Sequence, residues 1–281
     1  MTSHLLVPGL DEDKYHADTE TLSASGAKVL LGHREPSSAS EALRFGRLVH
    51  VAILEPDRLQ EYVSLDAEKI GVKADGTPAA VPTMTQAWKR AVAEAEADGK
   101  KIVSADDMAR AIKMADAARA HPTARRVIDM ATDVELSAYA DHPTGARVRA
   151  RFDLAGPIIG DIKSARNADP AVFGRTAYDL GYHVSCANYL DIATACGMDP
   201  AGFAFVNIEK EPPPGGVHRV SVTALSPGAI ELGRRRMHEA CLRWLALGKR
   251  IDLPSYGDGF TTVDLPVWAY SEENTDEETA A

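Results

Sequence analysis

Two aspartates and a lysine stand close together in the stretch RVRARFDLAGPIIGDIKSARN, residues 147–167. The stretch predicts a β-hairpin, because small or apolar residues alternate with polar ones on both sides of a Gly-Pro turn. Asp153 precedes the turn, and Asp161 and Lys163 follow it. Side chains of a strand alternate between its faces, so Asp161 and Lys163 share one face. The returning strand is expected to bring Asp153 near Asp161.

Carboxylates this close repel each other unless a positive charge lies between them. Mg²⁺ takes oxygen ligands in octahedral geometry, so paired carboxylates and a backbone carbonyl suit it. A nearby ammonium group could orient or deprotonate a water on the metal and stabilise a pentavalent phosphate. The pattern therefore indicates metal-assisted hydrolysis of a phosphodiester. The same residues could form a solvated ion pair between strands, but the surrounding run PIIGDIKSA is apolar, and a buried carboxylate needs a partner.

The composition limits the other functions open to this chain. It has 281 residues, 45% of them hydrophobic and 26% charged, which is ordinary for a globular protein with a sizeable core. The formal net charge of -10 gives no overall attraction to nucleic acid, so such a partner would need a local basic surface. The three cysteines are scattered and form no CxxC pair, which argues against a zinc ribbon or a disulfide framework. With no signal-peptide pattern and no apolar run of roughly 20 residues, we expect a cytoplasmic protein.

The order of the expected elements indicates the fold class. Periodicity and capping residues predict helices over 22–31, 37–56, 84–99, 104–122, 169–197 and 226–249. Besides the hairpin, alternation predicts strands over 134–141, 202–211 and 217–225. Residues 1–22 and 65–85 show neither pattern and are expected to be irregular. We therefore expect an α/β core of about five strands flanked by helices, with a helical N-terminal portion.

A single domain is expected over residues 1–270. Its helical part would cover about 14–125 and its catalytic core about 130–250. The remaining segment, SEENTDEETAA over 271–281, is acidic, and such a composition is typical of a disordered tail.

Several further motifs accompany the hairpin in a fixed order. They are KYHADTETLSASGAKVLL over 14–31, RFGRLVHVAILEP over 44–56, GYHVSCANYLDIA over 181–193 and LPVWA over 265–269. Together with the D-x7-D-I-K hairpin, they resemble the PD-(D/E)XK nuclease superfamily, and within its RecB-like branch the RecE-type phage and prophage exonucleases. This resemblance implies a PD-(D/E)XK core with a mixed sheet.

The resemblance also implies roles for matching residues. The metal ligands would be Asp153, Asp161, the backbone carbonyl of Ile162, His50 and Glu135, the last reaching a second metal. Lys163 would be the catalytic lysine. The implied cofactor is Mg²⁺, for which Mn²⁺ could substitute. Taken without the motif around it, His50 could be a core histidine, and Glu135 could be an exposed strand carboxylate.

Contacts to DNA are expected from two places. Relatives carry a Q-x-x-x-Y pattern on the helix after the lysine; here Tyr189 is present and Ser185 stands at the glutamine position. These two residues are one helical turn apart and would face the active site together, with Tyr182 close by. Arg151, on the hairpin, and Arg166, just after it, could line a phosphate path or belong to a solvated sheet face.

As a RecE-type enzyme, the protein would degrade one strand of linear double-stranded DNA from 5′ to 3′. The 3′ single strand would serve a RecT-type annealing protein in recombination, and relatives form closed rings, which implies a homo-oligomer such as a tetramer. Two alternatives remain. A four-cysteine iron–sulfur exonuclease is disfavoured by the three unclustered cysteines. A non-catalytic or differently specific DNA-binding relative is disfavoured by the intact aspartates and lysine, while Ser185 leaves it open.

Overall fold

The structure is a computed structural model that describes residues 4–33, 41–73, 75–252 and 259–266. The chain divides into a compact unit over Met1–Ile251 and a second unit over Asp252–Ala281. The compact unit thus ends before the predicted domain boundary at residue 270. The expected tail over 271–281 and the last three residues of the LPVWA motif lie outside the described residues. The following paragraphs concern the first unit.

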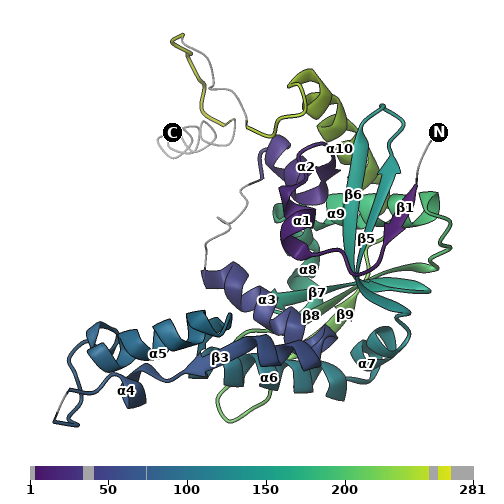
Figure 1. The fold of residues 1–281 in the computed structure, drawn as a ribbon. Coiled ribbons are helices and arrows are strands. Elements are labelled where there is room, and N and C mark those ends of the chain that lie inside the picture. The colour runs from purple at the N-terminus through teal and green to yellow at the C-terminus, as the bar shows by residue number, and fades with distance from the viewer. Residues whose placement is uncertain (1–3, 34–40, 74, 253–258, 267–281) are drawn as a thin grey trace, which may run out of the picture. The chain divides into compact units, whose positions relative to one another are not determined.

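A seven-stranded mixed sheet forms the centre of this unit (Figure 1). Its order is β1 (Leu5–Val7), β5 (Asp133–Asp141), β6 (Arg147–Ala155), β7 (Ile158–Ala165), β8 (Gly202–Glu209) and β9 (Val220–Thr223), with β2 (Leu22–Ser23) beside β6. Only the β2–β6 and β7–β8 pairs are parallel. The predicted mixed α/β fold and the hairpin β6–β7 are confirmed. Strands β1 and β2 add to the expected five, because two or three residues are too few to show alternation in the sequence.

Helices cover both faces of the sheet. One face packs against α2 (Ala24–Leu30), α8 (Pro170–Asp179), α9 (Tyr182–Ala195) and α10 (Pro227–Ala246). The other face packs against α3 (Glu41–Leu54), α6 (Ala105–Ala120) and α7 (Pro122–Asp129). The large buried side chains Phe152, Phe205 and Trp244 belong to the first layer of core, and Met114 and Ile162 to the second. Burial of these apolar surfaces holds the helices against the sheet.

The remaining elements are peripheral. Helix α1 (Glu12–Ala17) precedes β2, and a separate parallel pair is formed by β3 (Tyr62–Leu65) and β4 (Lys101–Ser104). The short helices η1 (Pro56–Glu61), α4 (Ala67–Ile70) and η2 (Pro82–Met84), with the longer α5 (Gln86–Ala97), complete this part. Residues 65–85, expected to be irregular, therefore contain two short helices. The expectation for residues 1–22 was also wrong, since these residues form β1, α1 and the start of β2.

Two helix boundaries differ from those predicted. The long helix expected over 169–197 is two helices, α8 and α9, which separate at Gly181. Gly181 has a φ of 65°, in the left-handed region that ends helices. Pro122, expected to end a helix, is instead the first residue of α7. The amide at this position has no hydrogen-bond partner within the helix, so a proline there loses no hydrogen bond. The His121 side chain caps α7 by accepting a hydrogen bond from the amide of Ala124.

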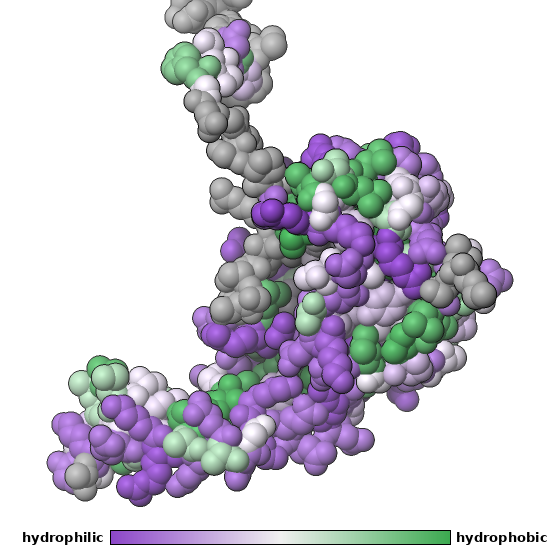
Figure 2. All heavy atoms as spheres, turned by 45° about the horizontal axis from the view of Figure 1, so that its top comes forward, coloured by the Kyte–Doolittle hydropathy of each residue, from purple (hydrophilic) through white to green (hydrophobic). Residues whose placement is uncertain are grey.

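The surface is largely polar. Figure 2 shows a face on which hydrophilic residues predominate and hydrophobic residues gather in small patches. This distribution is consistent with the large apolar side chains being enclosed in the two layers of core. Among the described residues, no helix combines the length and the apolar content needed to cross a membrane.

The close contact between α9 and α10 depends on Gly233. A Cβ atom at this position would lie 2.0 Å from the backbone oxygen of His183. We expect Gly233→Ala to lower the free energy of unfolding by about 1–3 kcal/mol, because the helices must move apart. Gly228→Ala, in the first turn of the same helix, is the control, since its Cβ would meet only Ser226 Oγ at 4.0 Å. Urea denaturation measures both; equal stability of the two variants would contradict this packing argument.

Candidate active site

Helix α3 brings His50 to the sheet. The helix buries its apolar face, including Leu48 and Val49, against the second core layer. Gly46 of this helix faces β7, where a Cβ would lie in ordinary contact, 3.8 Å from Ser164 Oγ. His50 Nε2 lies 3.0 Å from the backbone oxygen of Ile162. Because a carbonyl only accepts, Nε2 is the protonated donor, and Nδ1 is directed towards the carboxylates nearby.

Strands β5 and β6 place two of these carboxylates opposite each other. Val134 pairs with Leu154 and Leu136 with Phe152, so Glu135 stands opposite Asp153. Glu135 has a φ of 50°, which is uncommon for a residue other than glycine. Residues two positions apart on a strand normally point to the same face. Here Phe152 packs in one core layer and Leu154 in the other, so the alternation of side chains along β6 is interrupted at Asp153. This local distortion turns both carboxylates towards His50, and such distortions concentrate at functional sites.

His50, Glu135 and Asp153 form a compact cluster. His50 Nδ1 lies 3.6 Å from Glu135 Oε1 and 3.7 Å from Asp153 Oδ2. Each residue offers one ligand atom within 4.8 Å of the others. Asp153 Oδ2 also accepts a hydrogen bond of 2.6 Å from the Ile162 amide. Two carboxylates, one imidazole and the adjoining Ile162 carbonyl are a donor set that fits a divalent cation such as Mn²⁺ or Mg²⁺.

Asp161 is buried on β7 and is not part of the cluster of three, so its expected role as a metal ligand stays a prediction. Its Oδ1 accepts a hydrogen bond of 2.6 Å from Lys163 Nζ, and that ammonium lies 5.1 Å from the centre of the Tyr182 ring. The two strand residues do share a face, as alternation predicted. In this structure the aspartate holds the lysine.

Electrostatic interactions in the site shift several pKa values. Burial raises the pKa of Asp153 to about 8, with Asp161 and Glu135 adding to the shift and His50 opposing it. Burial alone would lower the pKa of His50, but the Asp153 and Glu135 carboxylates raise it to about 9. Burial would likewise lower the pKa of Lys163, but the Asp161 carboxylate raises it above the usual lysine value. Lys163 therefore stays positively charged at any physiological pH.

Only some of the residues expected to contact DNA line the cavity that contains the cluster. Tyr182 and Tyr189 line the cavity that contains the cluster. Ser185 lies on the same helix but is buried and does not line it. Arg166 is exposed after β7, outside the cavity lining. Arg151 lines the cavity, but its guanidinium bonds Glu135 Oε2 at 2.6 Å and the Leu10 carbonyl at 2.8 Å, so it supports the site and holds the N-terminal segment.

This cavity has a volume of about 460 Å³ and includes residues not singled out in the sequence. Glu12 and Tyr15 come from α1 and Arg47 from α3, and Lys210 directly follows β8. Arg47 precedes His50 by three positions, so helical periodicity could have indicated that both face the same side. No pattern in the sequence indicates that α1 lies at the cavity.

Comparison with known protein families identifies the chain. Residues 19–251 match the family described as a PDDEXK-like domain of unknown function (DUF3799). The chain belongs to this PDDEXK-like family. Its membership agrees with the superfamily predicted from the motifs, whereas the RecE-type assignment stays a prediction.

The fold of this PDDEXK-like protein is also found in a solved structure. It is similar to a crystal structure of a protein described as a "Putative exonuclease" from Eubacterium rectale, with a TM-score of 0.55 and 11% sequence identity. The similarity covers 94% of this chain and 99% of the other. At this identity it shows a common fold. A search of curated proteins gave no match.

Metal binding is expected to release protons and to strengthen as the pH rises. With pKa values near 8 and 9, Asp153 and His50 hold protons at neutral pH, whereas a bound cation requires a carboxylate and a neutral imidazole. The affinity for Mn²⁺ should therefore rise with pH and level off above about pH 9. Isothermal titration calorimetry in buffers of different ionisation enthalpy measures the affinity and the protons released.

Asp153→Asn should remove this affinity, because it replaces a charged ligand with an amide. Asp133→Asn is the matched control, since Asp133 is an exposed aspartate two residues before Glu135 on β5. Equal Mn²⁺ affinity of wild type and Asp153→Asn, or affinity independent of pH, would contradict the assignment of this cluster as the metal site.

Proposed function

We propose that this protein is a divalent-metal-dependent exonuclease that acts on the ends of linear double-stranded DNA, with the 5′-to-3′ direction of RecE-type enzymes. The observation that carries the proposal is the catalytic cavity, in which a cluster of metal-ligating residues lies beside a buried lysine on a PDDEXK-like fold. Family and fold support a nuclease; the motifs shared with RecE-type enzymes support the direction and the substrate.

The residues of the cavity suit hydrolysis of a phosphodiester. His50, Glu135, Asp153 and the Ile162 carbonyl would hold a divalent cation, which would supply Lewis acidity to neutralise phosphate charge and make water more acidic. Lys163 keeps its proton because Asp161 faces it, so its role is to stabilise the additional negative charge of the pentavalent phosphate. Asp161 is the positioning residue that holds this ammonium between the sheet and Tyr182.

The cavity also contains groups that can hold the DNA backbone. Arg47 and Lys210 line it beside the cluster, and Tyr189 offers an aromatic surface. Arg47 Nε lies 3.0 Å from Glu12 Oε1, and both side chains are part exposed. A DNA phosphate that approaches the cluster would therefore compete with Glu12 for Arg47.

The partners follow from the same resemblance. We propose that several copies assemble as a ring around DNA, with a tetramer as the expected form. Confinement of DNA within a ring would let a protein with a net charge of -10 remain on a polyanion. The 3′ single strand left by digestion would pass to a RecT-type annealing protein.

Digestion of end-labelled linear duplex DNA tests the proposed activity. Label should leave the 5′ ends when Mg²⁺ or Mn²⁺ is present, persist in EDTA, and leave covalently closed circular duplex intact. Lys163→Ala should slow the reaction by about 10²- to 10³-fold, because the phosphate loses a preorganised cation. Lys89→Ala, an exposed lysine on α5, should digest at the wild-type rate.

Two results would contradict the proposal in different ways. Linear DNA that stays intact with either metal would favour the non-catalytic DNA-binding relative. Loss of label from 3′ ends, or cutting of the circle, would keep the nuclease but reject the RecE-type specificity.

Glu12 is expected to weaken DNA binding by occupying Arg47. The His16 hydrogen bond and the Arg47 charge hold the pKa of Glu12 at about 2, although burial opposes them, so its charge persists at neutral pH. In the Lys163→Ala background, Glu12→Gln should tighten duplex binding by about two- to fivefold, the range of an exposed ion pair. Arg47→Gln should weaken binding and reduce the slope of log affinity against log salt by about one. Fluorescence anisotropy measures both; an unchanged slope in Arg47→Gln would exclude a phosphate contact.

A further inference from the structure

Strand β9 ends the central sheet and leaves one edge open. Among the described residues, β8 is the only strand that pairs with it. The amide of Glu209 donates to the carbonyl of Arg219, and the register continues with Ser221 opposite Asn207. Because antiparallel ladders alternate, the amide and carbonyl groups of Val220 and Val222 are directed away from β8. The free edge of β9 thus offers two donors and two acceptors in the spacing of a strand.

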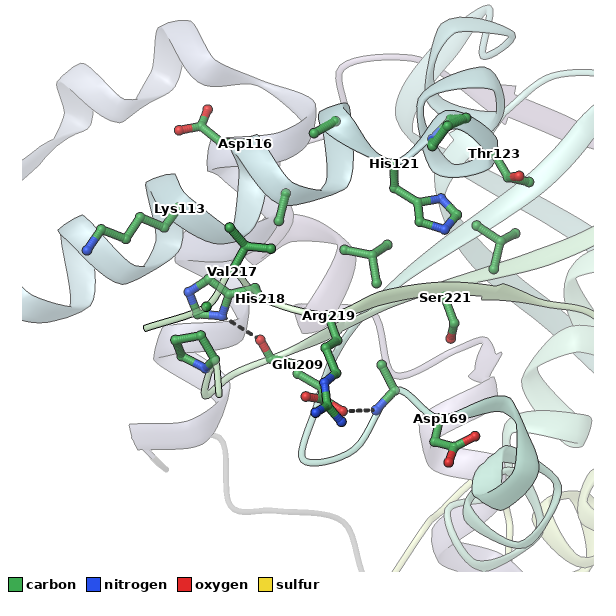
Figure 3. A pocket seen from close by; sticks show the side chains of 18 of the residues that line it. Lys113, Asp116, His121, Thr123, Asp169, Glu209, Val217, His218, Arg219 and Ser221 are labelled. Carbon is green, nitrogen blue, oxygen red and sulfur yellow. Dashed lines mark hydrogen bonds between the residues drawn. The ribbon is translucent and has the colours of Figure 1, made fainter. Parts of the chain in front are cut away.

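This open edge lies in the larger of the two cavities described for the molecule. The cavity, called here the β9 groove, has a volume of about 1240 Å³. Figure 3 shows His121 and Thr123 on one side of the strand that carries Ser221, and Asp169 on the other side. The edge therefore runs along the floor of a groove between the start of α7 and the start of α8. It shares no lining residue with the catalytic cavity.

The groove is built by fixed contacts. His218 is buried, and its Nδ1 lies 2.7 Å from the backbone oxygen of Glu209 (Figure 3). The buried Glu209 carboxylate accepts a hydrogen bond of 3.1 Å from the amide of Ala168. These bonds fix the turn before β9 and the segment before α8, so the walls are formed before any ligand binds.

The shape of the groove favours an extended chain. Its volume exceeds the roughly 300–1,000 Å³ of typical small-molecule sites. The α6 wall presents the small side chains Ala117 and Ala120, which leave room for apolar side chains of a strand laid along β9. A second copy fits less well, because its own β9 is equally recessed between helices and two recessed edges cannot meet.

The two cations of the lining can each pair with an acidic residue of the occupant. Lys113 and Arg219 line the groove, and neither has an ion-pair partner among the described residues. The N-termini of α7 and α8 also open into it, but they are already capped by the side chains of His121 and Asp169. The lining also contains three acidic side chains, of which Glu209 and Asp169 accept backbone hydrogen bonds and Asp116 lies on α6. Because an accepted hydrogen bond does not cancel the charge of a carboxylate, pairing with the occupant is local to Lys113 and Arg219 and is not an attraction of the groove as a whole.

We propose that the β9 groove binds an extended segment of a partner protein by strand addition to β9. The segment presents apolar side chains to the α6 wall and acidic side chains to Lys113 and Arg219. Main-chain hydrogen bonds to Val220 and Val222 provide affinity, and the wall and the two cations provide specificity. This surface is separate from the catalytic cavity and does not depend on the proposed nuclease activity.

Selection from a library of random peptides on the immobilised full-length protein tests the proposal. We expect enrichment of sequences with alternating apolar residues next to Asp or Glu. A synthetic peptide of the selected sequence is then measured by fluorescence anisotropy against wild type, Val222→Pro and Val222→Thr. Val222→Pro removes an amide that faces the groove and leaves the β8 ladder intact, so it should weaken binding about tenfold or more. Val222→Thr keeps the amide and the branched shape, and should bind the peptide as the wild type does.

Hydrogen exchange on the wild type provides a measurement that needs no variant to fold. The amides of Val220 and Val222 should exchange more slowly when the peptide is bound. The proposal would be overturned by a library without an enriched sequence, by equal binding to Val222→Pro when that variant melts like the wild type, or by unchanged exchange at both amides. Concentration-dependent self-association that Val222→Pro abolishes would overturn it in favour of a second copy.

Discussion

Asp153 carries a carboxyl group into the central sheet, and the free-energy cost of ionising that group there shapes its surroundings. An ionised carboxylate is stable in such a place only with close partners. Here one partner is the Ile162 amide on the next strand, and the other is the His50 imidazole, which comes from a distant part of the chain. The neighbouring carboxylates Glu135 and Asp161 each have a basic side chain of their own. The helical part of the chain is thereby held to the sheet by charge as well as by apolar packing.

The arginines of β6 illustrate how an acidic protein uses its cations inside the fold. The Arg149 guanidinium bonds the carbonyl oxygens of Asp18 and Thr21 and lies 4.9 Å from the centre of the Tyr15 ring. Together with Arg151, it fastens the N-terminal segment to the sheet. Such arginines are unavailable to a phosphate, so a nucleic acid would have to rely on the cations at the cavity surface. Buried arginines and surface arginines look the same in a sequence, and only the fold separates them.

The parts of the site that could be predicted from sequence are local or tied to a motif. The hairpin follows from alternation around a turn, and the shared face of Asp161 and Lys163 follows from the two-residue period of a strand. His50 could be assigned only through the motif around it, since helical periodicity does not say which strand a helix packs against. The preference of Asp161 for the lysine, the left-handed backbone of Glu135 and the burial of Ser185 arise from tertiary packing. The break at Gly181 was missed because apolar residues continue through both helices.

The donors for a metal come from three places in the chain: α3, the β5 strand, and the hairpin. The contact between His50 and Ile162 spans 112 residues, so it requires the helical part and the sheet to have docked. A partly folded chain in which only the hairpin has formed does not have the imidazole and the outer carboxylate in place. The order of folding thus acts as a safeguard: a chain whose helical part has not docked on the sheet would carry no assembled metal site, and the metal would be bound last, joining segments that only the native topology brings together.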